Sequence, residues 1–136
     1  MHLKRLRKRV GNIENKATKK ILRGDVVLAK LRWPRGSEQG GVRPAIIVQN
    51  NTGNKVAPTV IVVPITTQVK PDLPTHVNLC NIPFLDVRSV ATCEQITTID
   101  KNYVIRKMGT LNDPAMRQVE QAVSVSLGKG GVFERI

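Results

Sequence analysis

The segment Pro44–Thr66, PAIIVQNNTGNKVAPTVIVVPIT, carries the strongest strand signals in the chain. Its two ends, Pro44–Gln49 and Thr59–Thr66, are rich in β-branched residues, and residues 51–54 (NTGN) between them are typical of a turn. The pattern therefore predicts two neighbouring strands. Pro64 lies inside the second run, and because proline has no backbone N–H to donate, we expect a sheet edge or a bulge at that position.

Further short strands are predicted on both sides of this segment. They share a β-branched or alternating pattern and are flanked by turn residues; the candidates are Asp25–Lys30, Thr75–Leu79, Ser89–Thr92, Gln95–Thr98 and Tyr103–Leu111. A polar loop rich in glycine, residues 31–43, is expected to join the first two strands.

The chain changes period near its C-terminus. Asp113 suits a helix N-cap and Pro114 the first helical position. Gly128 supplies a stop, and the apolar positions at helical spacing before it are Met116, Val119, Ala122, Val123 and Leu127. Several short strands closed by one helix predict a mainly β fold, a small and strongly bent sheet or barrel with a C-terminal helix.

Composition restricts the kind of protein. With 136 residues, 40% of them hydrophobic, the chain fits one globular domain with a packed core. Aromatic residues make up only 3%, so an RRM or cold-shock domain, which stacks bases on several aromatic rings, is disfavoured. No apolar run approaches the roughly 18 residues of a membrane span, and no apolar segment follows the basic N-terminus as in a secretory signal.

The chain is strongly basic, with a formal net charge of +12. Residues 1–23 contain nine Lys or Arg and one acid, Glu14, so this segment carries +8 and the rest of the chain +4. Apolar residues at helical spacing within it leave two interpretations open, a basic helix or a flexible basic arm. Either form favours a polyanionic partner, bound with an affinity that falls steeply with salt.

The two cysteines, Cys80 and Cys93, lack the spacing of metal ligands. We expect them to be reduced in a cytoplasmic protein, with a disulfide between them as the open alternative. The sequence contains no Asp/Glu/His cluster of the kind that holds the ions of a two-metal nuclease, so neither a metal nor another cofactor is expected.

Residues 36–44, GSEQGGVRP, form the most distinctive motif. It is accompanied, in order, by RGDVV, IIVQN, PTVIV, LPTHV, EQITTIDK and VSL at residues 23–27, 46–50, 58–62, 73–77, 94–101 and 125–127. Together these segments resemble the MazF/PemK endoribonuclease toxins, from Arg23 to Leu127. We therefore predict a PemK-like domain over residues 24–128, preceded by the basic N-terminal arm 1–23 and followed by a C-terminal tail, 129–136.

The resemblance implies an SH3-like barrel of the type shared by PemK-like toxins and the CcdB gyrase poison. It also implies a homodimer that cleaves single-stranded RNA, such as mRNA, selectively by sequence and is neutralised by an acidic antitoxin peptide. In such toxins the Arg of GGVRP and the Thr at the end of an AIT-like strand form the catalytic pair, and these match Arg43 and Thr66. The chain departs from the family pattern at Thr97, where relatives carry Arg, and at Asn78, where many carry Glu.

RNA cleavage without metal uses the neighbouring 2′-hydroxyl as nucleophile and yields a 2′,3′-cyclic phosphate and a 5′-hydroxyl. The reaction needs a proton acceptor for that hydroxyl, positive charge beside the phosphorane, and a proton donor for the leaving oxygen. Arg43 suits the second role, because a guanidinium is permanently charged and its planar fork can hold two phosphate oxygens. The same permanent charge makes it a poor general base. Thr66 can donate a hydrogen bond to a non-bridging oxygen or orient the 2′-hydroxyl.

Two further catalytic candidates are His76 and Glu94. Histidine is the usual acid or base near neutral pH, and Glu94 matches the position where some PemK-like relatives carry a catalytic Asp; a structural role stays open for both. Candidate RNA contacts are amide, hydroxyl and indole side chains, namely Trp33 (which could equally cover the core), Ser37, Gln39, Asn50, Thr67 and Gln95.

Two other functions stay open. A protein of this fold can act without catalysis as an inhibitor of a protein target, as CcdB does. The basic arm and Thr97 also fit an RNA-binding paralogue with weakened activity. Arg43 and Thr66 at the matching positions favour the nuclease.

Overall fold

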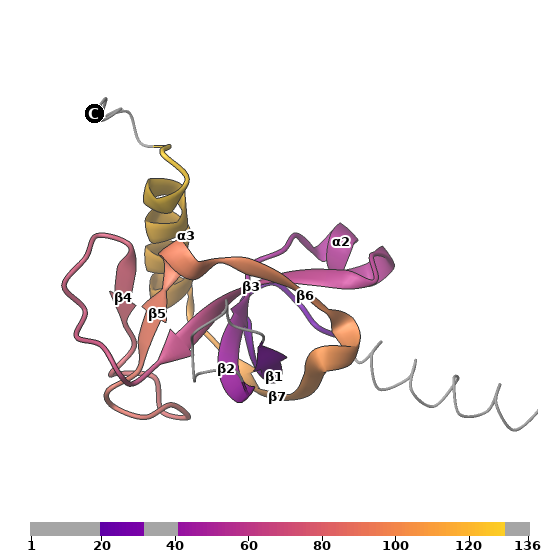
Figure 1. Ribbon diagram of the computed structural model, residues 1–136, viewed down its shortest axis with the longest axis horizontal. Coiled ribbons are helices and arrows are strands. Elements are labelled where there is room, and N and C mark those ends of the chain that lie inside the picture. Colours follow the sequence, from indigo (N-terminus) through magenta and orange to yellow (C-terminus); the bar gives the residue numbers. More distant parts are fainter. Residues whose placement is uncertain (1–19, 32–40, 130–136) are drawn as a thin grey trace, which may run out of the picture.

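The structure is a computed structural model that describes residues 20–31 and 41–129. Figure 1 shows a strongly bent sheet with one long helix standing against one end of it. The described elements are β1 (Asp25–Leu31), β2 (Gly41–Ile47), α2 (Asn51–Val56), β3 (Thr59–Thr66), β4 (His76–Asn78), β5 (Val90–Thr92), the 3-10 turn η1 (Cys93–Gln95), β6 (Thr97–Asp100), the 3-10 turn η2 (Lys101–Tyr103), β7 (Val104–Thr110) and α3 (Asp113–Ser126). The predicted mainly β fold with a C-terminal helix is confirmed.

All the strand pairs are antiparallel, and β3 is the central strand. The order across the sheet is β4-β5-β3-β2-β1-β7. One edge of β3 pairs with β2, with Ala45 opposite Pro64. Its other edge is shared, since β6 pairs with residues 59–62 and β5 pairs with Ile65 and Thr66. Strand β3 therefore joins the small β4-β5 pair to the rest of the sheet.

Pro64 lies in this central strand, so the expectation of a sheet edge there is wrong. Its carbonyl oxygen accepts a hydrogen bond from Thr92 Oγ1 at 3.1 Å, and the nitrogen of a strand residue points to the same side as its carbonyl. The missing N–H therefore faces the gap between β6, whose pairing ends at Val62, and β5, whose pairing begins at Ile65. Proline is tolerated at this position because the ladder changes partner there and requires no N–H.

The predicted turn after β2 is a short helix, α2. Asn50 caps it by accepting a hydrogen bond from Gly53 N at 2.8 Å. Asn54 is buried and donates through Nδ2 to the Gln49 carbonyl oxygen at 3.0 Å. The buried ammonium of Lys101 donates to the Asn54 carbonyl, near the end of the helix. These contacts outweigh the weak helix propensity of a segment rich in Asn and Gly.

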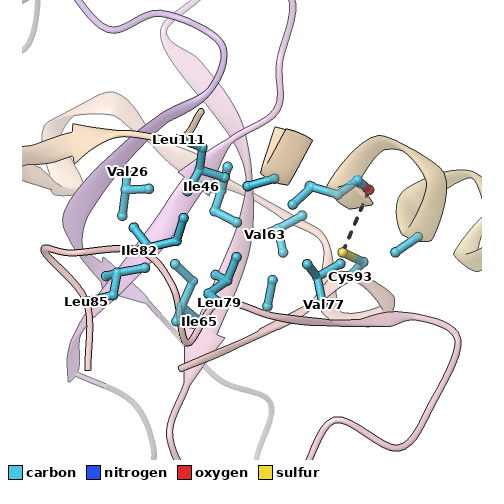
Figure 2. Packing of buried hydrophobic residues seen from close by; sticks show 14 residues of the cluster. Val26, Ile46, Val63, Ile65, Val77, Leu79, Ile82, Leu85, Cys93 and Leu111 are labelled. Atoms are coloured by element: carbon cyan, nitrogen blue, oxygen red, sulfur yellow. Dashed lines mark hydrogen bonds between the residues drawn. The ribbon is translucent and has the colours of Figure 1, made fainter. Parts of the chain in front are cut away.

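Apolar side chains are buried on both faces of the sheet. Because side chains alternate along a strand, Ile46 faces the larger cluster and Ile47 the smaller one. The larger cluster, drawn in Figure 2, includes Val119 of α3. The Val119 carbonyl oxygen accepts a hydrogen bond from Cys93 Sγ at 3.9 Å. The smaller cluster includes Ile21, so core packing begins inside the segment 1–23 that the sequence assigns to the arm.

Helix α3 begins beside the predicted cap. Asn112, not Asp113, is the N-cap, and its side chain accepts a hydrogen bond from Ala115 N at 2.9 Å. Asn and Asp are comparable caps, and an Asp in the first turn is favourable at the positive end of the helix dipole. Gly128 ends the helix as predicted, with a φ of +78°. None of the helices in the described part of the chain has the length and apolar character to cross a bilayer.

Strand β2 begins at Gly41, earlier than the predicted start at Pro44. It is extended by pairing with β1, where Arg43 lies opposite Ala29. Arg43 is thus a strand residue and not the last residue of a loop. Strand β6 begins later than predicted, at Thr97 instead of Gln95, and extends to Asp100. The 3-10 turn η1 takes up the start of the predicted range.

Candidate active site

An open cleft of about 540 Å³ lies where the start of β2 and the end of β3 meet the loop between β4 and β5. Its lining combines apolar side chains that belong to the larger core cluster or pack against it, Ile65, Phe84, Leu85 and Met108, with hydroxyl, amide and charged groups. The polar lining residues are Arg43, Thr66, Thr67, Gln68, Asp86 and Ser89. The cleft therefore has the mixed apolar and polar character of a ligand site.

Arg43 and Thr66 reach the cleft from adjacent strands. The paired part of the two strands ends with Ala45 opposite Pro64. Arg43 and Thr66 each lie two residues beyond this pair, and both line the cleft. Both side chains are half-buried, so both are partly shielded from water. The structure thus brings together the two residues that the sequence analysis singled out as the catalytic pair.

Thr66 and Thr67 both line the cleft and bring hydroxyl groups to it. Gln68 N donates to Thr66 Oγ1 at 3.1 Å. This bond uses a lone pair of the oxygen, so the Thr66 hydroxyl hydrogen can still be donated to a ligand. Gln68 Nε2 lies 3.5 Å from Thr67 Oγ1, at the long limit of a hydrogen bond. A guanidinium with a hydroxyl donor beside it is well suited to the oxygens of a phosphodiester.

The β4–β5 loop contributes Asp86, which the sequence analysis did not single out. Arg88 N donates to Asp86 Oδ1 at 2.8 Å, Arg88 Nε to the same oxygen at 3.1 Å, and Arg88 Nη2 to Oδ2 at 3.0 Å. These hydrogen bonds lower the pKa of Asp86 from 3.8 to about 2 and raise the pKa of Arg88. The sequence offers only a weak signal for this pair, because opposite charges two residues apart are common in loops.

His76 and Glu94 lie together, and neither is among the described residues that line the cleft. Glu94 Oε1 accepts a hydrogen bond from Thr75 Oγ1 at 2.8 Å, and Glu94 Oε2 lies 3.2 Å from His76 Nε2. The His76 side chain is 5% exposed, and its Nδ1 lies 3.6 Å from Asp72 Oδ1, beyond hydrogen-bonding distance. In these positions both side chains fasten the start of β4 to η1.

The predicted RNA contacts fall in different places. Thr67 lines the cleft. The side-chain oxygen of Asn50 is occupied in capping α2. Gln95 is exposed in η1, and Thr97 is exposed on β6 opposite Val62. Three candidates lie outside the described residues, namely Trp33, Ser37 and Gln39.

Residues 20–31 and 41–129 contain no group of three or more His, Cys, Asp or Glu side chains placed to hold a metal ion. Cys80 is exposed, Cys93 is buried, and both are free thiols, so the disulfide that the sequence left open is not formed. Burial, with a smaller effect of the neighbouring Glu94, raises the pKa of Cys93 to about 12.

The fold and the cleft define a small antiparallel β protein with a site suited to a phosphate-bearing ligand. The family model of PemK-like, MazF-like toxins of type II toxin–antitoxin systems matches residues 22–127. The chain is also 50% identical over 108 residues to the Endoribonuclease MazF of Staphylococcus saprophyticus, which covers 78% of this chain and 90% of that relative. This protein therefore belongs to the PemK-like, MazF-like toxin family.

Solved structures have the same architecture. An endoribonuclease in complex with its cognate antitoxin, from mycobacterial species, is 25% identical with a TM-score of 0.67, covering 79% of this chain and 95% of that chain. MazF from Deinococcus radiodurans is 21% identical with a TM-score of 0.69, covering 79% and 96% of the two chains. The fold expected from the family resemblance, that of the PemK-like toxins, is confirmed.

Proposed function

We propose that this protein is a metal-independent endoribonuclease that cleaves single-stranded RNA selectively by sequence, as the toxin of a toxin–antitoxin pair. The observation that supports this proposal most directly is the meeting of Arg43 and Thr66 in one open cleft. Both residues match the catalytic positions of the family pattern, in a chain 50% identical to an Endoribonuclease MazF.

Charge stabilisation is the central step of the proposed mechanism. The scissile phosphate binds with its non-bridging oxygens on the Arg43 guanidinium and the Thr66 hydroxyl. The 2′-oxygen attacks phosphorus, the bond to the 5′-oxygen breaks, the 2′-hydroxyl loses its proton and the leaving oxygen gains one. Negative charge builds on the non-bridging oxygens during attack, and a preorganised donor aimed at such charge contributes on the order of 3 kcal/mol.

Proton transfer is not assigned to the carboxylate in the cleft. Asp86 has a pKa of about 2, which makes it a weak proton acceptor at neutral pH. Glu94 and His76 lie outside the cleft lining and are proposed to be structural. The proton of the 2′-hydroxyl is therefore proposed to pass to water or to a phosphate oxygen held by Arg43.

Partners follow from the relatives and from charge. One solved relative is an endoribonuclease with its cognate antitoxin, and another is a MazE–MazF complex from Deinococcus radiodurans. With a net charge of +12, this chain suits an acidic antitoxin peptide as well as RNA. We propose a cytoplasmic homodimer whose basic N-terminal arm, residues 1–23, adds salt-sensitive affinity for RNA of any sequence.

The test is cleavage of single-stranded RNA by the full-length protein in excess EDTA. We expect fragments that end in a 2′,3′-cyclic phosphate and begin with a 5′-hydroxyl, identified by mass spectrometry. The matched control is the same oligonucleotide with one 2′-deoxy nucleotide before the cut, which must resist cleavage because it lacks the nucleophile. Absence of cleavage, or cleavage of the deoxy control, would refute the proposal.

A further inference from the structure

Asp86 brings a negative charge into the cleft that contains Arg43 and Thr66. An isolated carboxylate there would repel the phosphate of the substrate. Arg88 offsets that charge through two side-chain hydrogen bonds to Asp86. The site therefore retains the hydrogen-bonding oxygens of a carboxylate with little of its net charge.

The loop holds Asp86 in a defined position. Leu85, immediately before it, is buried in the larger core cluster, and its N–H donates to the Ile82 carbonyl oxygen at 3.0 Å. Ser89 is also buried, and its N–H donates to the Asp86 carbonyl oxygen at 2.9 Å. With a buried residue next to it and another three residues later, the Asp86 backbone is anchored. The two hydrogen bonds from the Arg88 guanidinium then hold the Asp86 carboxylate, so the carboxylate is positioned before a ligand binds.

One of the two carboxylate oxygens retains hydrogen-bonding capacity. Among the described residues, Asp86 Oδ1 accepts from Arg88 N and Nε, whereas Oδ2 accepts only from Arg88 Nη2. Each carboxylate oxygen offers about two lone-pair sites. The Asp86 side chain lines the cleft and is 43% exposed, so the carboxylate is accessible to a donor on a ligand there.

We infer that Asp86 is a specificity-determining residue of the proposed nuclease, which accepts a hydrogen bond from the exocyclic amino group of a base beside the scissile phosphate and disfavours uracil at that position. The inference rests on the proposed function. Adenine, cytosine and guanine each carry an exocyclic amino group, whereas uracil has none: it carries two carbonyl oxygens, with its one ring N–H donor between them. A carboxylate oxygen facing a carbonyl oxygen is repulsive and leaves both without a donor.

The protonation state of Asp86 fits this role. Its hydrogen bonds to Arg88 hold its pKa at about 2, so the carboxylate stays an acceptor throughout the neutral range. The same low pKa argues against Asp86 as the base that deprotonates the 2′-hydroxyl. Reading a base and transferring a proton are therefore separable in an experiment.

The experiment is cleavage of a random single-stranded RNA pool by the full-length protein, with both ends of each cut sequenced. For the wild type we expect uracil to be depleted about tenfold at one position next to the cut. Asp86→Asn replaces one acceptor oxygen with a donor amide of the same shape, so this depletion is expected to disappear. The matched control is Asp72→Asn, which removes the same charge from a side chain that is 77% exposed and outside the cleft lining; its cleavage motif should equal that of the wild type.

A wild-type motif that tolerates uracil at every position would overturn the inference, and so would an unchanged motif in Asp86→Asn. Both results leave the proposed nuclease standing. A wild type that cuts no RNA would instead overturn the nuclease and this inference together. The three outcomes are therefore distinguishable.

A second measurement does not depend on how well the Asp86 variant folds. The preferred base in a short substrate is replaced by an analogue without the exocyclic amino group, such as purine riboside for adenosine or inosine for guanosine. Wild-type protein is expected to cut the analogue about tenfold more slowly, the loss of one hydrogen bond to a charged acceptor. Equal rates on the two substrates would overturn the inference.

Discussion

Arg43 of β2 and Thr66 of β3 line one cleft, and each lies two residues beyond the last pair between the two strands, Ala45 on β2 with Pro64 on β3. In the proposed mechanism, a phosphate bound in this cleft contacts both the guanidinium and the hydroxyl. Both groups are carried by strands of the sheet, which favours the precise positioning that catalysis requires.

Arg43→Ala should lower the single-turnover rate of RNA cleavage on the order of 100- to 1000-fold, because the main positive charge beside the phosphorane is lost. The cleavage rate of Arg43→Lys should lie between those of Arg43→Ala and the wild type, because lysine keeps the positive charge but lacks the planar guanidinium. Arg117→Ala, on the exposed face of α3 and outside the cleft lining, is the matched control and should cleave normally. Wild-type cleavage by Arg43→Ala would remove the basis of the mechanism.

Thr66→Val has nearly the shape of the native residue but no hydroxyl. We expect it to lower kcat roughly 10- to 100-fold, the effect of losing one hydrogen bond to a charged oxygen. Thr66→Ser keeps the hydroxyl and should retain most of the rate. Steady-state kinetics on a short RNA would check both variants. If the Ser and Val variants were equally slow, the hydroxyl would not be the functional group and Thr66 would act through packing.

The features that the sequence predicted are those encoded by local pattern. The β-branched run Thr59–Thr66 forms the central strand, and the apolar positions at helical spacing after Asp113 belong to the helix α3. Arg43 and Thr66 could be selected because family resemblance marks them, although nothing in the residues alone shows that they meet. Their meeting depends on the register of β2 and β3, which single-chain periodicity does not determine.

The features that the sequence missed depend on contacts between distant residues. Residues 51–54 have the composition of a turn, yet the helix α2 forms because Gln49 and Lys101 satisfy the polar groups of Asn54. Pro64 suggests an edge, and only the change of partner along β3 explains its central position. Asp86 reaches the cleft because Leu85 is buried, and tertiary burial of this kind is not visible in a loop sequence.

Glu94→Gln tests whether this carboxylate is structural or catalytic. The change weakens its hydrogen bonds to Thr75 and His76. We expect a loss of about 1 kcal/mol in the free energy of unfolding, below the usual value for a charged hydrogen bond because the side chain is 35% exposed. Urea denaturation and cleavage kinetics on the same preparation would check this, and kcat should stay near the wild-type value. A large loss of kcat at unchanged stability would instead make Glu94 catalytic.

The two thiols should differ sharply in reactivity. Burial raises the pKa of Cys93 to about 12, so at pH 8 almost none of it is the reactive thiolate, whereas Cys80 is exposed. Iodoacetamide should therefore label Cys80 alone in the folded protein and both cysteines in denaturant, as read by peptide mass spectrometry. Cys80→Ser should leave the folded protein unlabelled. Rapid labelling of Cys93 in that variant would show that η1 opens readily.

Gly109 of β7 packs directly against Phe84, which both contacts the core cluster and lines the cleft. A Cβ atom at Gly109 would lie 2.5 Å from Phe84 Cε2 and 2.6 Å from Cδ2, so the ring must move. Gly109→Ala should therefore cost roughly 1–3 kcal/mol in the free energy of unfolding, as overpacking does elsewhere. It should also slow cleavage, because the displaced ring changes the shape of the cleft.

Phe84→Leu relieves the clash, so the double variant Gly109→Ala/Phe84→Leu should be more stable than the sum of the two single effects predicts. Strict additivity in urea denaturation would mean that the ring is not what excludes a side chain at Gly109.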